Sequence, residues 1–422
     1  MKLHLPVRLF RAIVVLCSLI SGVATTVASM SYAAAPEDAV EVILINEDDL
    51  ARAEHTVNDR EFLVKADLLF DGVSSPYMGA DAESWYFSGT PELSMIFTHA
   101  TNRVFDVAET KTLEFDGFED ILFDANVKEV NGGGAIYLGS SATLNLIANK
   151  NVVFSGNQAT CNHGGTIYGV SSSSIMLNDN GSVKFCANSS WYGGAMYGGA
   201  IILNNNKLVE FSENSASTWN YAKGGAVYGN TVTLNGNDRV TFSRNSTTGS
   251  TDDNYTVYGG AIYGREVTLS NNKYVEFLNN SADNGDQDGY GGAIYGSTIT
   301  LNDNESVTFI GNKASSYGGA IYGYSNSTIT LSGNGSVEFS GNLGGAISSG
   351  NGRSTITLSR NSSVTFRNSG GIEARDGGTL TMSENDKVTF SGNGIHMWGT
   401  SAITLSNNGS VEFNVGGIQV ST

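Results

Sequence analysis

From about residue 140 onward, apolar and polar positions recur in one pattern along the chain. The pattern reads aliphatic, any residue, Leu, two of any, Asn, two of any, Val, any, Phe, and residues 299–309 carry it in full. Ile299 and Leu301 alternate with Thr, as do Val307 and Phe309, and a period of two residues is typical of β-strands. We therefore expect two strands per copy, separated by a turn at the Asn. The ten Asn positions are Asn149, Asn180, Asn206, Asn237, Asn272, Asn304, Asn334, Asn361, Asn385 and Asn408.

The spacing of the copies predicts how the strands are arranged. Copies follow one another at intervals of 23 to 35 residues, which is the signature of a solenoid. No proline follows Pro91, so every backbone N–H of the repeats can donate to a strand ladder. We predict an all-β fold, a right-handed parallel β-helix of about ten to eleven coils and roughly 50 Å in length. The handedness comes from the general rule for crossovers between parallel strands.

Two shorter motifs separate the strand pairs. Gly-Gly-Ala-Ile-Tyr or a close variant occurs at residues 133–137, 164–168, 193–197, 224–228, 259–263, 291–295 and 318–322, and decays at 344–347, 370–372 and 416–418. Paired glycines permit a bend with positive φ or a close backbone approach, so we expect a turn between sheets there. Phe-x-x-Asn precedes most of these turns, with its Asn at Asn126, Asn157, Asn188, Asn214, Asn245, Asn280, Asn312, Asn342 and Asn393.

The alternation of many Gly-Gly-Ala-Ile and Phe-x-x-Asn copies resembles the chlamydial-type polymorphic outer membrane protein family of autotransporters. The resemblance implies a right-handed passenger β-helix, displayed on the cell surface as an adhesin for host cells, and a C-terminal barrel in the outer membrane. The repeats here run to Thr422 without alternating barrel strands. We therefore expect outer-membrane association through a separate barrel or partner, or release of the chain; homo-association is a further alternative.

The chain divides into three predicted parts, of which the first is an export signal. Lys2, Arg8 and Arg11 precede an apolar run at 12–20 and small residues up to Ala33, the order of a secretory signal peptide. Residues 1–33 are therefore predicted to be a signal peptide, 34–112 an N-terminal capping region, and 113–422 the β-helix. In an exported protein a pair of cysteines can be oxidised, so a disulfide between Cys161 and Cys186 is one of two alternatives, the other being free thiols.

The charge of the chain excludes one class of partner. With 23 Lys and Arg against 41 Asp and Glu, the formal net charge is −18. Such a surface repels nucleic acids and other polyanions at long range. We expect a protein or glycan on a host or neighbouring cell as the partner.

Candidate binding residues lie in a tyrosine register and in loops of variable length. Tyr228, Tyr263, Tyr295 and Tyr322 end successive Gly-Gly motifs; they lie outward if the preceding Ile lies inward, and in the core if the Ala does. The stretches 215–223, 246–258 and 281–290 vary in length from coil to coil, so we expect them to form a recognition edge. Their candidate residues are Trp219, Tyr221, Asp252, Asp253, Tyr255, Asp286, Asp288 and Tyr290.

The sequence does not favour catalysis or a cofactor. β-Helical polysaccharide lyases and hydrolases need clustered carboxylates with basic residues or a pair of acids across a groove, whereas His55, His99, His163 and His396 are scattered here. Residues 284–289 resemble the start of a calcium loop, but Tyr295 stands where a ligating Glu is required. We predict no catalytic, cofactor or metal residues and a non-catalytic, multivalent adhesin at the outer membrane surface or outside the cell. The alternatives are a β-helical polysaccharide-active enzyme and a periplasmic structural protein.

Overall fold

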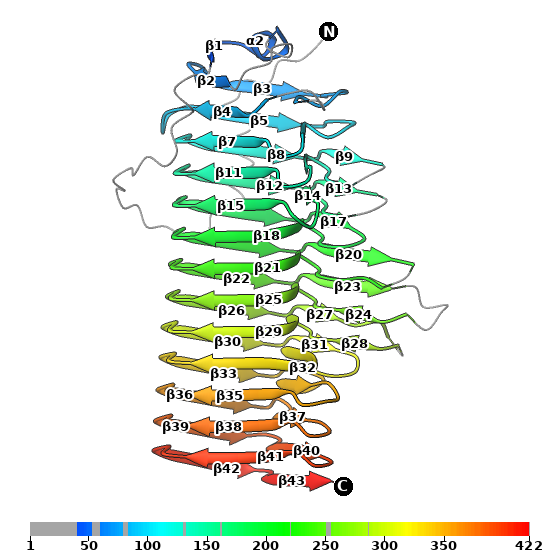
Figure 1. Ribbon diagram of the computed structural model, residues 1–422, viewed down its shortest axis with the longest axis vertical. Helices are drawn as coiled ribbons and strands as arrows, with labels where there is room; N and C mark the ends of the chain where they lie inside the picture. The colour runs from blue at the N-terminus through cyan, green and yellow to red at the C-terminus, as the bar shows by residue number, and fades with distance from the viewer. Residues whose placement is uncertain are drawn as a thin grey trace.

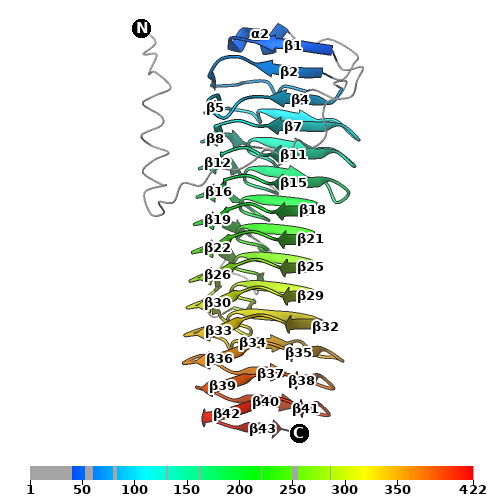
Figure 2. The same cartoon turned by 90° about the vertical axis from the view of Figure 1, so that its left-hand side faces the viewer.

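A computed structural model describes residues 40–52, 60–78, 83–129, 132–160, 163–219, 221–249, 255–285 and 287–421. These residues form a long rod of stacked parallel strands, with smaller strands projecting from one side (Figures 1 and 2). All of the strand ladders between the named strands are parallel, which confirms the predicted parallel β-helix. Within the described ranges, one short helix, α2 (Glu47–Arg52), lies at the N-terminal end of the rod. The predicted signal peptide at 1–33 lies outside the described residues.

One face of the rod is a thirteen-stranded sheet that carries the Val-x-Phe part of each repeat, here called the phenylalanine sheet. Its strands are β3 (Leu68–Asp71), β5 (Ser94–Thr98), β8 (Asp120–Asp124), β12 (Asn151–Ser155), β16 (Ser182–Cys186), β19 (Leu208–Ser212), β22 (Arg239–Ser243), β26 (Tyr274–Leu278), β30 (Ser306–Ile310), β33 (Ser336–Ser340), β36 (Ser363–Arg367), β39 (Lys387–Ser391) and β42 (Ser410–Val415).

The second face is a 21-stranded sheet, here called the leucine sheet. One ladder carries the aliphatic-x-Leu part of the repeats in β1 (Val40–Leu44), β2 (Arg60–Val64), β4 (Trp85–Ser88), β7 (Thr112–Asp116), β11 (Thr143–Ile147), β15 (Ser174–Asn178), β18 (Met196–Asn204), β21 (Val227–Asn235), β25 (Ile262–Ser270), β29 (Ile294–Asn302), β32 (Ile321–Ser332), β35 (Thr355–Ser359), β38 (Thr379–Ser383) and β41 (Ala402–Ser406). A second ladder begins each coil after the glycine turn, in β6 (Phe105–Val107), β10 (Ile136–Leu138), β14 (Ile167–Gly169), β34 (Ile347–Ser349), β37 (Ile372–Ala374), β40 (Ile395–Trp398) and β43 (Ile418–Ser421). In β18, β21, β25, β29 and β32 the two parts join into one continuous strand.

The projecting strands form a third sheet, here called the lateral sheet. It has seven short strands, β9 (Val127–Lys128), β13 (Gln158–Ala159), β17 (Ser189–Ser190), β20 (Ser215–Thr218), β23 (Ser246–Gly249), β27 (Ser281–Ala282) and β31 (Lys313–Ala314). Two more strands, β24 (Val257–Tyr258) and β28 (Gly289–Tyr290), pair with each other beside it. Much of the predicted loop edge is therefore built on strands.

The core is a set of identical residues stacked along the rod axis. Phe pairs with Phe in neighbouring strands of the phenylalanine sheet from Phe70 to Phe413. Neighbouring rings, such as Phe211 and Phe242, stack with centroids 4.7 Å apart and planes 2° apart. The stacking arises because parallel strands in register place equivalent side chains one strand spacing apart. The repeat Phe residues therefore form a continuous column in the core.

Buried Asn side chains join each coil to its neighbours. The Oδ1 of Asn272 accepts hydrogen bonds from the backbone N–H and the Nδ2 of Asn237, both at 2.9 Å. The Nδ2 of Asn272 donates to the Leu234 carbonyl at 3.0 Å and to the Asn304 Oδ1 at 2.9 Å. The same bonds recur from Asn149 to Asn408, so the Asn at each predicted turn belongs to a continuous ladder along the rod. A second ladder, built from the Asn of Phe-x-x-Asn, runs from Asn126 to Asn342.

Each glycine pair makes the turn into the leucine sheet. Gly224 has a φ of +65°, which suits glycine. A Cβ added to Gly225 would lie 2.0 Å from the carbonyl oxygen of Gly260 in the next coil. The first glycine therefore supplies the bend and the second the close backbone approach between coils.

The stack is longer than the repeat signature predicts, which corrects two expectations. The phenylalanine sheet has thirteen strands where ten to eleven coils were expected, and residues 60–112, assigned to a capping region, pair in register with the repeats. The repeat pattern does not reveal these coils, because Phe62, Phe87 and Phe115 stand where the repeats have a core Leu. Their rings stack with centroids 4.7 Å apart for Phe62 and Phe87 and 4.8 Å apart for Phe87 and Phe115. Helix α2, with Leu50 fully buried, lies at the end of the stack.

Of Cys161 and Cys186, the structure describes Cys186. Cys161 lies outside the described residues. The sulfur of Cys186, on the phenylalanine sheet, accepts a hydrogen bond from the Ser212 hydroxyl at 3.3 Å.

The Asn ladder predicts a specific loss of stability. Asn237→Ala removes the acceptor of the Asn206 backbone N–H and Nδ2, and it removes the side-chain donor to the Leu203 carbonyl and to the Asn272 Oδ1, which keeps the backbone N–H of residue 237. Each buried polar group left without a partner costs about 1–3 kcal/mol, so the free energy of unfolding is expected to fall by roughly 2–5 kcal/mol. Urea unfolding followed by circular dichroism measures it. The control Asn351→Ala changes an exposed Asn and is expected to shift it by less than about 0.5 kcal/mol. Equal losses in the two variants would contradict a ladder that stabilises the rod.

Candidate functional site

The tyrosines of the glycine motif lie on the outer face of the leucine sheet. In β21 the side chain of Val227 is buried in the core, and alternation along the strand turns Tyr228 outward. The Ala before each such aliphatic residue, for example Ala226, is buried as well. It lies in the turn before the strand, so the alternation of the strand does not apply to it. Of the two orientations left open by the sequence, the structure has the outward one.

These outward tyrosines stack into a column, here called the inner column. The centroids of Tyr197 and Tyr228 are 4.5 Å apart, those of Tyr228 and Tyr263 are 4.7 Å apart, and the planes differ by 9° and 10°. The column continues through Tyr295 at 5.1 Å to Tyr322 at 5.6 Å. Because neighbouring rings cover one another's faces, the column presents mainly ring edges and hydroxyl groups.

A second column, the outer column, consists of the residue immediately before each glycine pair. Parallel bridges connect its members, His163, Tyr192, Lys223, Tyr258, Tyr290 and Tyr317, along the rod, directly or through the pair β24 and β28. The sequence carried a signal for it, since an aromatic residue, His or Lys precedes every complete Gly-Gly-x-x-Tyr motif from 164 onward.

The two columns pack against each other. The ring of Tyr258 meets that of Tyr295 at 4.8 Å and 66°, and His163 meets Tyr197 at 4.4 Å and 74°. Such edge-to-face pairs are favourable contacts between aromatic rings. The array is consequently partly buried, and only 6% of the surface of Tyr295 is exposed.

Burial of the array changes its titration. Desolvation raises the pKa of Tyr263 to about 12, and that of Tyr322 to about 12. It also raises the pKa of Tyr197 and of Tyr295. Desolvation lowers the pKa of the Lys223 ammonium. These four tyrosines are therefore neutral donors and acceptors at physiological pH.

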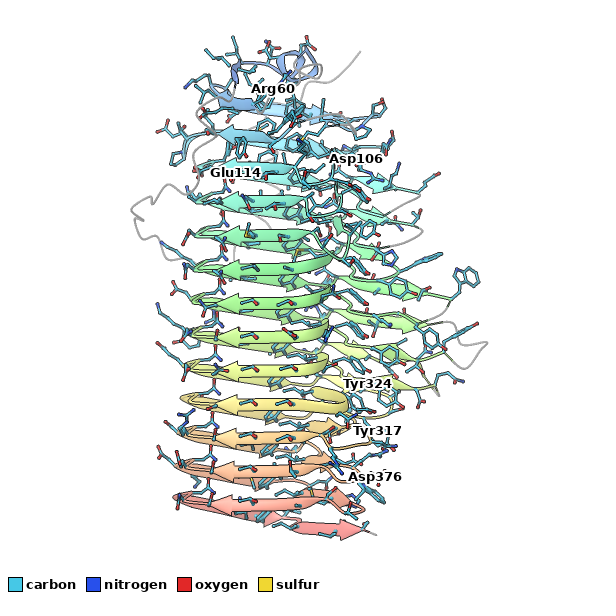
Figure 3. The ribbon with its side chains drawn as sticks, in the orientation of Figure 1. Arg60, Asp106, Glu114, Tyr317, Tyr324 and Asp376 are labelled. Atoms are coloured by element: carbon cyan, nitrogen blue, oxygen red, sulfur yellow. The ribbon has the colours of Figure 1, made fainter. Side chains whose placement is uncertain are left out.

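A pocket of about 530 Å³ opens where Lys223 takes the place of an aromatic residue in the outer column. The ammonium of Lys223 lies 5.0 Å from the ring centroid of Tyr263 and 5.8 Å from that of Tyr258. Figure 3 shows Tyr324, one of the lining residues, where the leucine sheet meets the projecting strands. The lining residues are Tyr221, Lys223, Tyr228, Gly229, Asn230, Tyr258, Tyr263, Gly264, Arg265, Tyr295, Ser297 and Tyr324. This set is here called the Lys223 pocket.

A larger hollow of about 680 Å³ lies farther toward the C-terminal end of the rod. Among the described residues, its one acidic lining residue already has partners: the Oε1 of Glu373 accepts from Arg375 at 3.0 Å and from the Trp398 Nε1 at 3.0 Å. The Arg375 guanidinium also lies 3.8 Å from the centroid of Tyr317, labelled in Figure 3. The Lys223 pocket is therefore the better candidate.

The structure brings together several of the candidate residues named from the sequence. Tyr221, Tyr228, Tyr263 and Tyr295 line the Lys223 pocket, and Tyr221 meets Tyr255 with centroids 6.0 Å apart. Tyr322 follows Tyr295 in the inner column. Trp219, just after β20, is 75% exposed.

The remaining candidates lie away from the pocket or outside the described residues. Asp288 accepts a hydrogen bond from the Ser316 hydroxyl at 2.7 Å, and Tyr290 packs on Tyr322 at 4.8 Å. Asp252, Asp253 and Asp286 lie outside the described residues. Sequence reasoning did not single out Lys223, Tyr258, Arg265 and Tyr324.

The Phe-x-x-Asn motif lies away from any binding surface. From Phe123 to Phe309 its Phe residues are fully buried, as are its Asn residues from Asn126 to Asn312. The motif is architectural and does not reach a partner in the folded rod.

Other site types find little support in the described part of the chain. His99 lies beside Asp71 at 3.1 Å, His163 lies in the outer column, and His396 lies 2.9 Å from the Ser421 hydroxyl. Among the described residues, no group of three or more His, Cys, Asp or Glu is placed to hold a metal ion. Nor does any helix in those ranges have the length and apolar character to cross a lipid bilayer.

Comparison with protein families identifies the repeats. Residues 239–265, 274–297 and 306–324 match the Chlamydia polymorphic membrane protein (Chlamydia_PMP) repeat. Residues 239–324 therefore contain polymorphic membrane protein repeats. The matched segments run from β22 to β32 and contain Tyr263, Arg265, Tyr295 and Tyr324 of the Lys223 pocket, so the family resemblance seen in the sequence is confirmed there. No curated protein and no solved structure matches the chain.

The pKa values predict the response of the polymorphic membrane protein repeats to alkali. An unfolded Tyr ionises near pH 10, whereas Tyr263 and Tyr322 ionise at about 12 in the fold. The free energy of unfolding is therefore independent of these groups below pH 10 and falls between pH 10 and 12. In Tyr263→Phe that fall is expected to be shallower. Tyrosinate absorbance of the folded chain, compared with the urea-unfolded chain, measures the shift; coincident curves would contradict a buried array.

Proposed function

We propose that the chain is the passenger of an autotransporter-type adhesin that is exported and acts at the outer surface of the cell. The polymorphic membrane protein repeats support this function, because that family is associated with the outer membrane and with adhesion. The observation that carries the proposal is the concentration of aromatic side chains along one edge of the rod. The strands β24 and β28 project from one side of the rod (Figure 1), and they carry Tyr258 and Tyr290 of the outer column, which packs against the inner column.

The rod suits repeated weak contacts. Each coil advances by about one strand spacing, close to 5 Å, so equivalent groups recur at short intervals along the edge. Several weak contacts to one surface raise the overall affinity without any single strong site. Contact by this mechanism is non-catalytic, since it needs no general acid or base. Tyrosine and tryptophan are well suited to it because they combine a large apolar area with a polar group.

The lateral sheet would present the most accessible contact groups. Trp219 is 75% exposed and Tyr221 46% exposed, and both follow β20. The next strand of the lateral sheet, β23, pairs with β20 over its full length, which fixes the base of this segment. Exposed aromatic side chains on a fixed base have little conformational entropy to lose on binding.

Adhesion of the intact chain tests this proposal. Beads coated with the chain are expected to bind cultured host cells, and the double variant Trp219→Ser, Tyr221→Ser is expected to reduce the number of bound beads at least about fivefold. The reduction follows from loss of aromatic contact area on the exposed edge. Counting beads per cell by microscopy gives the measurement.

Tyr274→Ser is the matched control, because Tyr274 is 45% exposed but lies on the phenylalanine sheet. It is expected to leave adhesion unchanged, and all variants should keep the melting temperature of the parent chain. Equal adhesion by the double variant and the parent would contradict the proposed recognition edge. Absence of adhesion by the parent to host cells and to neighbouring bacterial cells would contradict the proposed function.

A further inference from the structure

We infer that the Lys223 pocket binds one carboxylate-bearing sugar, at the end of a glycan on the contacted cell. The inference rests on the proposed function and deepens it, because it names the ligand class at one point of the adhesive edge. It depends on three features of the pocket: its place in the outer column, its charge and its rim.

The first feature is a substitution in an otherwise aromatic column. Tyr192 and Tyr258 hold the positions on either side of Lys223 in the outer column. An ammonium on a flexible stem replaces a ring there, and a pocket of about 530 Å³ lies beside it. Pockets of about 300–1,000 Å³ are typical of small-ligand sites. The size suits a sugar ring with its substituents.

The second feature is positive charge in an acidic protein. The charged residues that line the pocket are Lys223 and Arg265, whereas the whole chain carries a formal charge of −18. By comparison, Arg239 in β22 forms an ion pair with Glu276 at 2.7 Å, and Lys273, just before β26, forms one with Asp238 at 2.6 Å. Within the described residues, Lys223 and Arg265 take part in no ion pair.

Lys223 is also partly desolvated. Its ammonium lies over the rings of Tyr258 and Tyr263, and burial lowers its pKa. A partly buried charge without an opposite charge is unfavourable, so a bound carboxylate would stabilise it. Desolvation raises the pKa of Tyr258, and the charge of Asp288 adds to that rise; the Oδ1 of Asp288 accepts a hydrogen bond from the Ser316 hydroxyl.

The third feature is the rim, which suits the remainder of a sugar. Tyr221 and Tyr324 are 46% and 55% exposed and line the pocket opening. Exposed aromatic side chains pack against the apolar face of a pyranose ring, and Asn230 and Ser297 supply neutral hydrogen-bonding groups. A free inorganic anion would not use these aromatic groups.

The net charge limits the ligand to a single acid. A long sulfated polysaccharide would bring many negative charges against a surface of the same sign, and long-range repulsion would oppose its approach. One carboxylate at the end of an otherwise neutral glycan meets only the local positive charge. A polyanion is therefore the competing outcome of the test.

Titration calorimetry of the full chain with 3′-sialyllactose and with lactose tests the inference. The sialylated sugar is expected to bind at least about tenfold more tightly than lactose. Lys223→Met keeps the aliphatic stem and removes the charge, and it is expected to abolish this preference. Lys223→Arg is expected to retain it. Lys273→Met, which removes an exposed cation in the turn before β26, is the matched control and should leave it unchanged. Circular dichroism confirms that each variant is folded.

The inference is overturned by no binding of 3′-sialyllactose, by equal affinity for the two sugars, or by an undiminished preference in Lys223→Met. Tighter binding of heparin than of 3′-sialyllactose would overturn it in favour of a polyanion. Bead adhesion to sialidase-treated cells separates this inference from the proposed function. If adhesion persists there but is still lost in the Trp219 and Tyr221 double variant, the adhesive function stands and the acidic-sugar site fails.

Discussion

The axial hydrogen bonding between buried Asn side chains is the interaction on which the rest of this structure depends. Each Asn amide bonds the coil before and the coil after it, as Asn272 does with Asn237 and Asn304. Because the bonds require Asn above Asn, they fix the register of every coil against the next. A slip of one residue would break both ladders and turn each core side chain toward the opposite face of its sheet.

Because the register is fixed, equivalent side chains of successive repeats stack in continuous columns along the rod. Inside the rod it produces the Phe column and the close backbone approach that only glycine allows at Gly225. Outside the rod it produces the inner and outer tyrosine columns. The same constraint that stabilises the fold therefore builds the proposed adhesive edge. A residue that departs from the repeat, such as Lys223 in the outer column, creates a local pocket among otherwise similar coils.

The sequence predicted the fold well where the repeat is strict. Asn, Phe and the glycine pairs have one role each, and that role depends on local spacing, so the parallel β-helix, the Asn ladder and the turns could all be inferred. The coils between residues 60 and 112 were missed because Phe62 and Trp85 fill the core without the repeat residues. The site was only partly predictable. The tyrosine register was visible in the sequence. Its packing against Tyr258 and Tyr290 depends on where the strands β24 and β28 lie, which spacing alone does not give.

The central claim is that this rod acts at the outer surface of the cell that makes it. Protease shaving of intact cells, followed by blotting of the cell and medium fractions for this chain, tests the claim most directly. The account predicts that the cell-associated band is lost on shaving while a periplasmic marker stays intact. A band that remains protected until the envelope is broken would contradict it, and would leave a periplasmic structural role as the better explanation of the same fold.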